Sequence, residues 1–243
     1  IIVGGAINKS KDAKKATEEI KRSIYQLKKI KTELFKRVDE KDIVKILIKI
    51  STSNLSDAMH RLGALKDIIS VNPGLKMCGQ ALTVRTYPGD WAKPVEAIDM
   101  AHEGQVIVID AGGVGPAIWG ELATHGAIQK KIAGVVIDGA IRDVKEIRSL
   151  KFPAFSKMIS PSAGEPKGFG EIGVSINVGG VKVFSGDWVL GDDDGVVVVP
   201  RDKAVEFVNR AMSVMETENR LRKEIDEGST LSKVTELLKW EKK

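Results

Sequence analysis

The sequence predicts an α/β protein in which helices pack against a mixed β-sheet. First, β-branched runs alternate with helical patterns between residues 81 and 150, which favours parallel strand pairing. Second, the apolar runs after Ser156 are joined by short turns such as Asp193-Asp194-Gly195, which suit antiparallel connections. Third, 42% of the 243 residues are hydrophobic, enough to bury one sizeable core or two small ones.

The first 36 residues are predicted to form a unit of their own, ahead of a main domain over residues 37–243. Ile1 to Val3 form a β-branched run that ends at Gly4-Gly5, and a helix is expected from about residue 11 to 38. A strand, glycines and a helix in this order can place a phosphate at a helix N-terminus. The chain opens without an initiator Met, so we expect its numbering to begin inside a longer polypeptide.

The main domain is predicted to contain helices and strands in alternation. A helix near residues 41–48 precedes a cluster of capping residues at 51–54 and a short amphipathic helix that ends at Gly63. Further helices are expected at 92–101, 120–131, 144–150 and 202–227, with a last one reaching Trp240. The strand-like runs are 81–86, 106–110, 135–138, 154–156, 174–178, 181–184, a run at Val189, and 196–199.

Charge and composition exclude several classes of protein. Lys and Arg number 38 against 33 Asp and Glu. This net charge of +5 is spread over Lys-rich helices, which favours solvated helix faces over a nucleic-acid site. Aromatic residues make up only 5%, so bases have no stacking platform. Cys78 stands alone, which excludes an internal disulfide and a Cys-based zinc cluster. Short apolar runs and the lack of a signal-peptide pattern predict a cytoplasmic protein without membrane contact.

The stretch from Val135 to Asp143 carries the strongest local signal for a functional site. A buried strand is predicted to end in a tight turn at Gly139 and then to present Arg142 and Asp143 side by side. The Arg142 guanidinium suits a carboxylate or an enolate oxygen, and the Asp143 carboxylate suits Mg²⁺ or Mn²⁺. The alternative is a surface ion pair that caps the following helix.

A glycine-rich stretch from Gly112 to Glu121 is the second candidate. Its glycines let backbone amides approach a ligand, and the helix that follows favours an anion at its N-terminus. Glu121 is equally explained as a helix-dipole residue, and His125, one turn later, is more typical of a surface histidine than of a catalytic one. The three acidic residues at 192–194 are explained by a turn between two strands.

Glu218 interrupts the apolar stripe of the terminal helix. The stripe consists of Val205, Val208, Met212, Met215, Leu221 and Ile225. A carboxylate in such a stripe either reaches a partner group or lies at a subunit boundary, and a side chain extended to solvent at the edge of the core is the simpler alternative.

Residues 43–228 resemble the RraA-like family. It includes class II 4-hydroxy-4-methyl-2-oxoglutarate aldolases, their oxaloacetate-decarboxylating relatives and regulators of ribonuclease E activity. Six blocks carry the resemblance in the same order: residues 52–58, 79–84, 88–90, the glycine-rich stretch, 135–143 and 186–196. The resemblance implies a swivelling β/β/α sandwich, here with an N-terminal strand-helix extension, that assembles as a homotrimer or a dimer of trimers with sites between subunits.

The resemblance also implies a set of site residues. The aldolases carry an acidic residue, twenty intervening residues and then Arg-Asp, which Glu121 and Arg142-Asp143 match, although Asp is commoner at the first position. Asp143 would bind Mg²⁺ or Mn²⁺, Glu121 would hold the ion's waters, and Glu218 of a neighbouring subunit would contact the ion through water. Arg142 and Glu121 would be the catalytic residues. Arg142 and the backbone of Gly120, Glu121, Leu122 and Ala123 would bind the pyruvyl group of a 2-oxo acid.

A separate resemblance covers residues 1–28, which look like the final strand and helix of a hexulose-6-phosphate synthase barrel. Archaeal proteins fuse that synthase to an RraA-like domain, so the segment is expected to be a remnant without activity.

Two classes of function follow from these resemblances. The first is a metal-dependent lyase, a class II aldolase or decarboxylase, acting on a 2-oxo acid, for which a sugar-derived substrate is one variant. The alternative is a non-catalytic protein that modulates the fused synthase or an RNA-processing enzyme.

Overall fold

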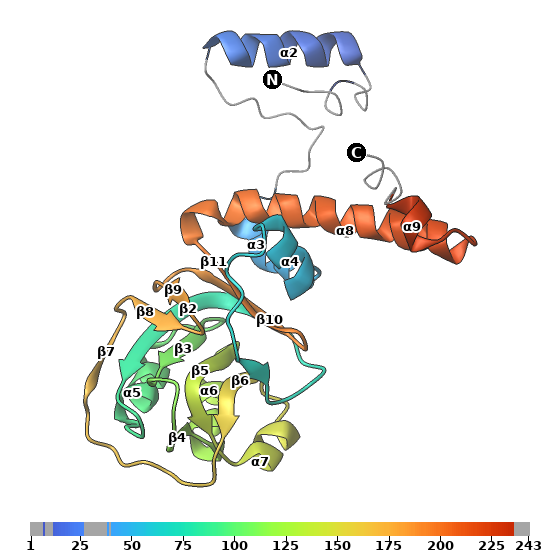
Figure 1. Ribbon diagram of the computed structural model, residues 1–243. Coiled ribbons are helices and arrows are strands. Elements are labelled where there is room, and N and C mark those ends of the chain that lie inside the picture. Colours follow the sequence, from blue (N-terminus) through green and yellow to red (C-terminus); the bar gives the residue numbers. More distant parts are fainter. Residues whose placement is uncertain (1–6, 8–11, 27–37, 39, 236–243) are drawn as a thin grey trace.

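The computed structural model describes residues 7, 12–26, 38 and 40–235, and it confirms the mixed α/β architecture (Figure 1). The main sheet has the strand order β1 (Ile69–Ser70), β6 (Ala154–Ile159), β5 (Gly134–Ile141), β3 (Val106–Asp110), β2 (Met77–Thr86), β10 (Trp188–Asp192) and β11 (Gly195–Val199). Strand β4 (Ala117–Trp119) pairs with β5, and β7 (Gly170–Ile172) pairs with β2. A separate hairpin joins β8 (Ile176–Val178) and β9 (Val181–Val183).

Strand β2 links an antiparallel part of the sheet to a parallel part. Its first residues, Met77 to Gln80, pair antiparallel with β10, whereas Ala81 to Arg85 pair parallel with β3. Strands β3, β5 and β6 continue the parallel part, and β4 runs parallel to β5. The carboxyl ends of β2, β3, β4, β5 and β6 therefore lie along one edge of the sheet, which we call the carboxyl edge.

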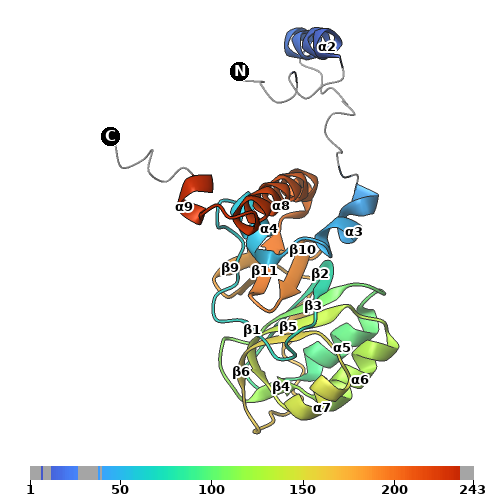
Figure 2. The same ribbon diagram turned by 90° about the vertical axis from the view of Figure 1, so that its right-hand side faces the viewer.

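The helices cover the sheet in two groups (Figure 2). Helices α5 (Ala92–Met100), α6 (Glu121–Gln129) and α7 (Val144–Ser149) lie on the parallel part. Helices α3 (Ile43–Leu47), α4 (Thr52–Ala58) and α8 (Ala204–Asp226) pack against β10 and β11. The other elements are α2 (Ala13–Gln26), α9 (Leu231–Val234) and 3₁₀ turns at Glu40–Asp42 and Arg201–Lys203.

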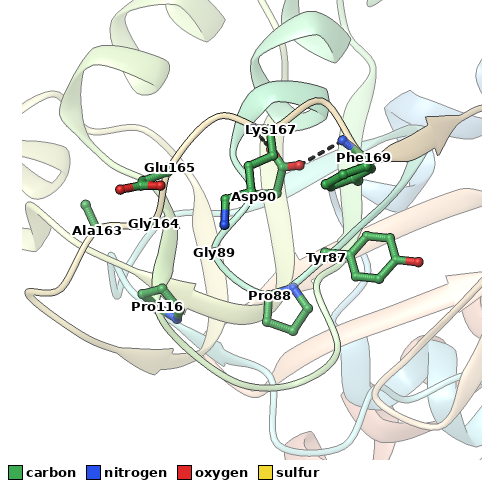
Figure 3. Close-up of a pocket in the computed structure, with 10 residues that line it drawn as sticks. All are labelled: Tyr87, Pro88, Gly89, Asp90, Pro116, Ala163, Gly164, Glu165, Lys167 and Phe169. Carbon is green, nitrogen blue, oxygen red and sulfur yellow. Dashed lines mark hydrogen bonds between the residues drawn. The ribbon is translucent and has the colours of Figure 1, made fainter.

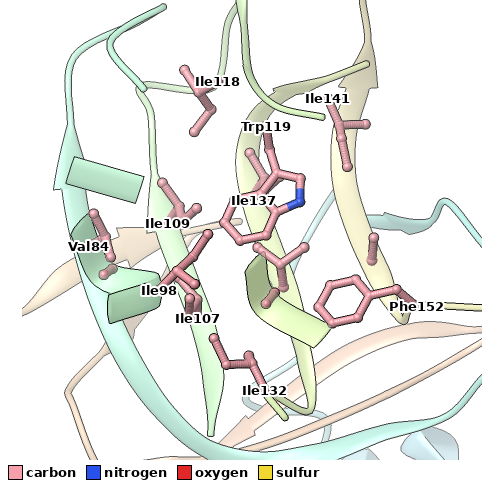
Figure 4. Close-up of a cluster of buried hydrophobic side chains, with 14 of the residues drawn as sticks. Val84, Ile98, Ile107, Ile109, Ile118, Trp119, Ile132, Ile137, Ile141 and Phe152 are labelled. Atoms are coloured by element: carbon pink, nitrogen blue, oxygen red, sulfur yellow. The ribbon is translucent and has the colours of Figure 1, made fainter. Parts of the chain in front are cut away.

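Alternation of side chains along β3 builds a core on each face of the parallel sheet. Ile107 and Ile109 belong to the cluster under α5–α7, which Figure 4 shows, whereas Val106 and Val108 belong to a cluster with the β8–β9 hairpin. Every residue of β5 is buried because both of its faces are covered. This double coverage explains why both strands are nearly continuous apolar runs in the sequence.

Several boundary predictions were wrong, among them the short helix predicted to end at Gly63, which is α4 and ends at Ala58. The strand predicted to end before Gly139 continues to Ile141, because β4 pairs with Ala140 and Ile141 and prolongs the ladder. The helix predicted to reach Val38 does not do so, since Val38 is not helical, and the described part of that helix is α2. The predicted strand at residues 1–3 and the Gly4-Gly5 pair lie outside the described residues.

The acidic residues at 192–194 form the turn between β10 and β11, as predicted, and Asp192 also contacts the start of α4. Asp192 and Gly195 pair at the end of the β10–β11 hairpin. The Asp192 carboxylate accepts hydrogen bonds from the Thr52 backbone N–H at 2.8 Å and from its hydroxyl at 2.6 Å, which fixes the start of α4. None of the helices in the described part of the chain is long and apolar enough to span a bilayer.

Candidate functional site

The residues predicted from the aldolase pattern meet at the carboxyl edge because β4 and β5 are neighbouring parallel strands. Trp119 of β4 is paired with Ile141 of β5, so the next residues, Gly120 and Arg142, leave the sheet side by side. The Arg142 backbone N–H also donates to the Trp119 carbonyl oxygen at 3.0 Å. The twenty residues between Glu121 and Arg142 are therefore the number needed to complete helix α6, turn back and run through β5 to the same edge of the sheet.

Asp143 holds its carboxylate against the N-terminus of α6. Its backbone is left-handed, with φ 56°, a conformation that Asp tolerates better than most residues. Although Asp143 is the N-cap of α7, its side chain makes no cap hydrogen bond there, and Oδ2 instead accepts the Glu121 backbone N–H at 3.1 Å. Oδ1 accepts no hydrogen bond from the described residues. The alternative from the sequence is thus confirmed in one part and wrong in the other: Arg142 and Asp143 form a partly exposed ion pair, but the Asp143 side chain does not cap the following helix.

Gly120 creates the space that the Asp143 carboxylate fills. A Cβ atom at residue 120 would lie 2.4 Å from Asp143 Oδ2 and 3.2 Å from Arg142 Cγ. Its φ of −158° is accessible to any residue, so glycine is required here for space and not for conformation. Because residue 120 has no side chain, the Asp143 carboxylate and the Arg142 side chain can both lie against the N-terminus of α6.

Arg142 presents a largely uncommitted guanidinium. Its Nε lies 3.5 Å from Asp143 Oδ2, and its side chain is 43% exposed. The terminal nitrogens Nη1 and Nη2 make no hydrogen bond or ion pair with the described residues. The planar fork is therefore available for a carboxylate or an enolate oxygen.

Glu121 opens helix α6 and forms a pair with His125. The distance from Glu121 Oε1 to His125 Nε2 is 3.6 Å, and both side chains are about half exposed. A carboxylate in the first turn also interacts favourably with the helix dipole, so the structure is compatible with both readings of Glu121. The sequence did not decide whether His125 lies near the site. The structure places it beside Glu121, a predicted site residue.

The amides available to a ligand are fewer than the glycine-rich stretch suggested. Gly112, Gly113 and Ala117 donate their N–H groups to Asp110, Asp138 and Ser162, so they hold the loop together. In the described part of the chain, the amides of Gly120, Leu122 and Ala123 donate no hydrogen bond. These unpaired donors lie at the positive end of the α6 dipole beside Arg142, an arrangement that favours a negatively charged group.

Glu218 lies far from these groups within one chain. Helix α8 packs on α3 and α4 beside β10 and β11, whereas α6 lies on the parallel part of the sheet (Figure 1). Glu218 is half-buried on α8. Only a neighbouring chain could bring it to Arg142, so its predicted role stays a prediction.

Sequence reasoning missed a charge pair between the buried Asp138 and the partly exposed Lys157, which lies beside the glycine-rich loop. Asp138 is 8% exposed; its Oδ2 accepts the Gly179 N–H at 2.8 Å, and its Oδ1 lies 3.5 Å from Lys157 Nζ. The Asp138 carbonyl oxygen accepts the N–H groups of Ala111 and Gly113. In the sequence, the only sign of this pair is that Asp138 directly follows a buried apolar run. That position does not show that Lys157, on another strand, is its partner.

A pocket of about 620 Å³ also opens at the carboxyl edge (Figure 3). It is lined by residues 87–90, by Pro116 and by the loop at 163–169, and we call it the loop pocket. The buried Asp90 carboxylate holds its walls together, because it accepts the N–H groups of Ala92, Lys167, Gly168 and Phe169 at 2.8–3.3 Å.

Asp90→Asn is expected to lower the free energy of unfolding by about 1–2 kcal/mol at pH 7. Burial raises the pKa of Asp90, but the backbone hydrogen bonds outweigh it and leave the pKa below its ordinary value. The stabilisation is therefore present above about pH 4 and lost as the pH falls through the folded-state pKa. Urea unfolding at several pH values measures the difference from the wild type.

The matched control is Asp99→Asn, because Asp99 is an exposed residue of α5 whose side chain makes no hydrogen bond in the described part of the chain. This control should unfold like the wild type at each pH. A difference between Asp90→Asn and the wild type that stays constant down to low pH would contradict the assignment.

The family is decided by comparison with known proteins. Residues 52–198 match the family model described as RraA-like, aldolase/RraA. The chain belongs to the RraA-like family. The matched range contains Glu121, Arg142 and Asp143, whereas Glu218 lies beyond it.

Three RraA-like relatives show the breadth of this likeness. An uncharacterized protein of Methanocaldococcus jannaschii is 38% identical over 195 residues, which cover 79% of this chain and 93% of that protein. A 4-hydroxy-4-methyl-2-oxoglutarate aldolase of Thermus thermophilus is 31% identical over 61% of this chain and 92% of its own. The structure of Streptomyces coelicolor RraAS2, described as an unusual member of the RNase ES inhibitor RraA protein family, is similar with a TM-score of 0.68. The two chains are 29% identical, over 77% of this chain and 100% of that chain.

The RraA-like neighbours confirm the predicted fold class. None of these three relatives is described as a hexulose-6-phosphate synthase, so the second resemblance, over residues 1–28, stays a prediction.

Proposed function

We propose that this chain is a divalent-metal-dependent lyase that cleaves pyruvyl-containing 2-oxo acids such as 4-hydroxy-4-methyl-2-oxoglutarate or oxaloacetate. The observation that carries the proposal is the convergence of Arg142, Asp143 and the free amides of α6 at one point of the carboxyl edge. The likeness to an aldolase of Thermus thermophilus supports the same reaction class.

The reaction requires stabilisation of negative charge. Retro-aldol cleavage or decarboxylation breaks the bond beyond C3 of the 2-oxo acid and leaves its electron pair on a pyruvate enolate. Arg142 and the amides of Leu122 and Ala123 form a cationic and dipolar surface that would hold the substrate's carboxylate and the developing enolate oxygen. A donor placed where such charge develops is typically worth about 10²–10³ in rate.

The residues present fit a hard cation that retains water. Among the described residues no group of three or more His, Cys, Asp or Glu side chains is placed to hold a metal ion. Mg²⁺, however, is commonly bound by one or two carboxylates and keeps several waters. Asp143, with its unpaired Oδ1, would bind the ion directly, and Glu121 would hold its waters. A bound Mg²⁺ or Mn²⁺ would supply a Lewis acid for the enolate oxygen.

A neighbouring subunit would complete this arrangement. In the part of the chain that the structure describes, Asp143 and Glu121 place carboxylates at the α6 N-terminus, whereas Glu218 lies on α8, which packs on another part of the fold. We therefore propose a homotrimer, or a dimer of trimers, in which Glu218 of the adjacent subunit contacts the ion through water.

A regulatory role is the second candidate. It is favoured by the likeness to RraAS2, described as an unusual member of the RNase ES inhibitor RraA protein family, which extends over 77% of this chain. A regulator that only binds an RNA-processing enzyme or a fused synthase has no need of an acidic residue, an Arg and an Asp around a free helix N-terminus. The lyase proposal accounts for this arrangement and the regulatory one does not.

The test is pyruvate release from oxaloacetate by the purified chain, with Mg²⁺ or Mn²⁺ and after chelation. We expect turnover that requires the metal, and a loss of about 10²-fold in Asp143→Asn, which keeps the left-handed backbone but not the charge. Asp99→Asn again serves as the control and should keep full turnover. Release no faster than that of a metal-only blank would contradict the lyase proposal and favour the regulatory one.

A further inference from the structure

The loop pocket is built rigidly from three loops that are distant in sequence. An added Cβ at Gly164 would lie 1.7 Å from the Gly89 carbonyl oxygen, so the two backbones touch. The Trp91 indole N–H donates to the Gly164 carbonyl oxygen at 3.1 Å. Together with the hydrogen bonds of Asp90, these contacts fix the shape of the pocket before any ligand arrives.

One side of the loop pocket is an exposed aromatic pair. The rings of Tyr87 and Phe169 pack edge to face with centroids 5.7 Å apart, yet the residues remain 64% and 58% exposed. Figure 3 shows this pair on the opposite side of the pocket from Glu165. Two large rings left exposed beside a cavity indicate a surface that a ligand covers.

The pocket also carries two charges without partners. The side chains of Lys167 and Glu165 form no hydrogen bond or ion pair with the described residues, and both residues are exposed. An ammonium group and a carboxylate beside apolar rings match a ligand with a carboxylate, several hydroxyls and an apolar C–H face.

The loop pocket is separate from the site at Arg142. It reaches the glycine-rich loop at Pro116, and four residues of mostly extended chain through β4 lead from there to Gly120. An extended strand rises about 3.3 Å per residue, so the two positions are about 13 Å apart along β4. A six-carbon acid bound to Arg142 is therefore too short to reach into the loop pocket as well.

We propose that the loop pocket is a second ligand site, one that binds a sugar acid. The carboxylate pairs with the Lys167 ammonium, the hydroxyls donate to Glu165, and the C–H face packs on Phe169. This site goes beyond the lyase proposal and does not depend on it, since binding is measured without turnover.

The test is a ligand-observed NMR titration of the full chain with D-gluconate. We expect a Kd of about 1 mM, which a ligand of this size reaches at ordinary efficiency per atom. D-glucose, which lacks the carboxylate, should bind about tenfold more weakly, and Lys167→Gln and Phe169→Leu should each weaken gluconate binding by about tenfold. Both side chains are exposed, so neither substitution should unfold the chain.

Lys182 and Phe184, which have the same spacing in the sequence as Lys167 and Phe169, provide matched controls. Lys182 Nζ lies 5.1 Å from the centroid of the half-exposed Phe184 ring, away from the residues that line the pocket. Lys182→Gln and Phe184→Leu should leave gluconate binding unchanged, as should Arg142→Ala and saturating pyruvate. The proposal is overturned if gluconate does not bind, if the Lys182 and Phe184 variants weaken it equally, or if pyruvate displaces it.

Discussion

Arg142→Ala is expected to lower kcat/KM for pyruvate release by about 10²–10³-fold. The substitution removes the only guanidinium beside the free α6 amides in the described part of the chain, and the enolate would lose its cationic side-chain partner. The Arg142 side chain is 43% exposed and lies outside the core, so the melting temperature should change little. Steady-state kinetics with a fixed Mg²⁺ or Mn²⁺ concentration measure the effect.

Two further variants sharpen this result. Arg142→Lys keeps the positive charge but loses the planar guanidinium. We expect its kcat/KM to exceed that of Arg142→Ala by no more than about tenfold. Arg210→Ala removes an exposed arginine of α8 that pairs with Glu206, and it should react like the wild type. An Arg142→Ala variant with near-normal kcat/KM would show that charge stabilisation at this point is not used.

Gly120→Ala is expected to lower kcat/KM by about 10²-fold, because a displacement of about 1 Å at a catalytic site costs that much. The new Cβ would meet Asp143 Oδ2 at 2.4 Å, so the carboxylate must leave the Glu121 amide. The overpacking should also lower the free energy of unfolding by about 1–3 kcal/mol. Kinetics and thermal unfolding of the same preparation separate the two effects.

Gly126→Ala is the matched control in the same helix. A Cβ at residue 126 would meet Ile98 Cγ2 at 3.5 Å, an ordinary contact, so the variant should stay active. Replacing glycine inside a helix should also stabilise the fold by about 0.5–1 kcal/mol. If both glycine variants lose activity equally, the effect comes from the helix and not from the space beside Asp143.

The sequence determined the elements whose pattern is local. The strand predicted at 106–110 was observed over those same residues, because four β-branched residues in a row both favour a strand and suit a sheet covered on two faces. The prediction of helices after the strands in the parallel part was confirmed, and the boundaries differ by only a few residues. The resemblance to the aldolases pointed to Glu121 and Arg142, and these residues lie in segments that meet at the carboxyl edge.

Tertiary structure alone decided how these segments meet. Strand β4 lies hidden in a glycine-rich stretch, because its partners, Ala140 and Ile141, are more than twenty residues away and leave no local period. The direction of the Asp143 carboxylate follows from the space at Gly120, which no pattern of apolar residues encodes. The loop pocket likewise arises where three loops are joined by the Asp90 carboxylate. Local propensity thus set which residues form strands and helices, whereas contacts between residues distant in the chain set which side chains share a site.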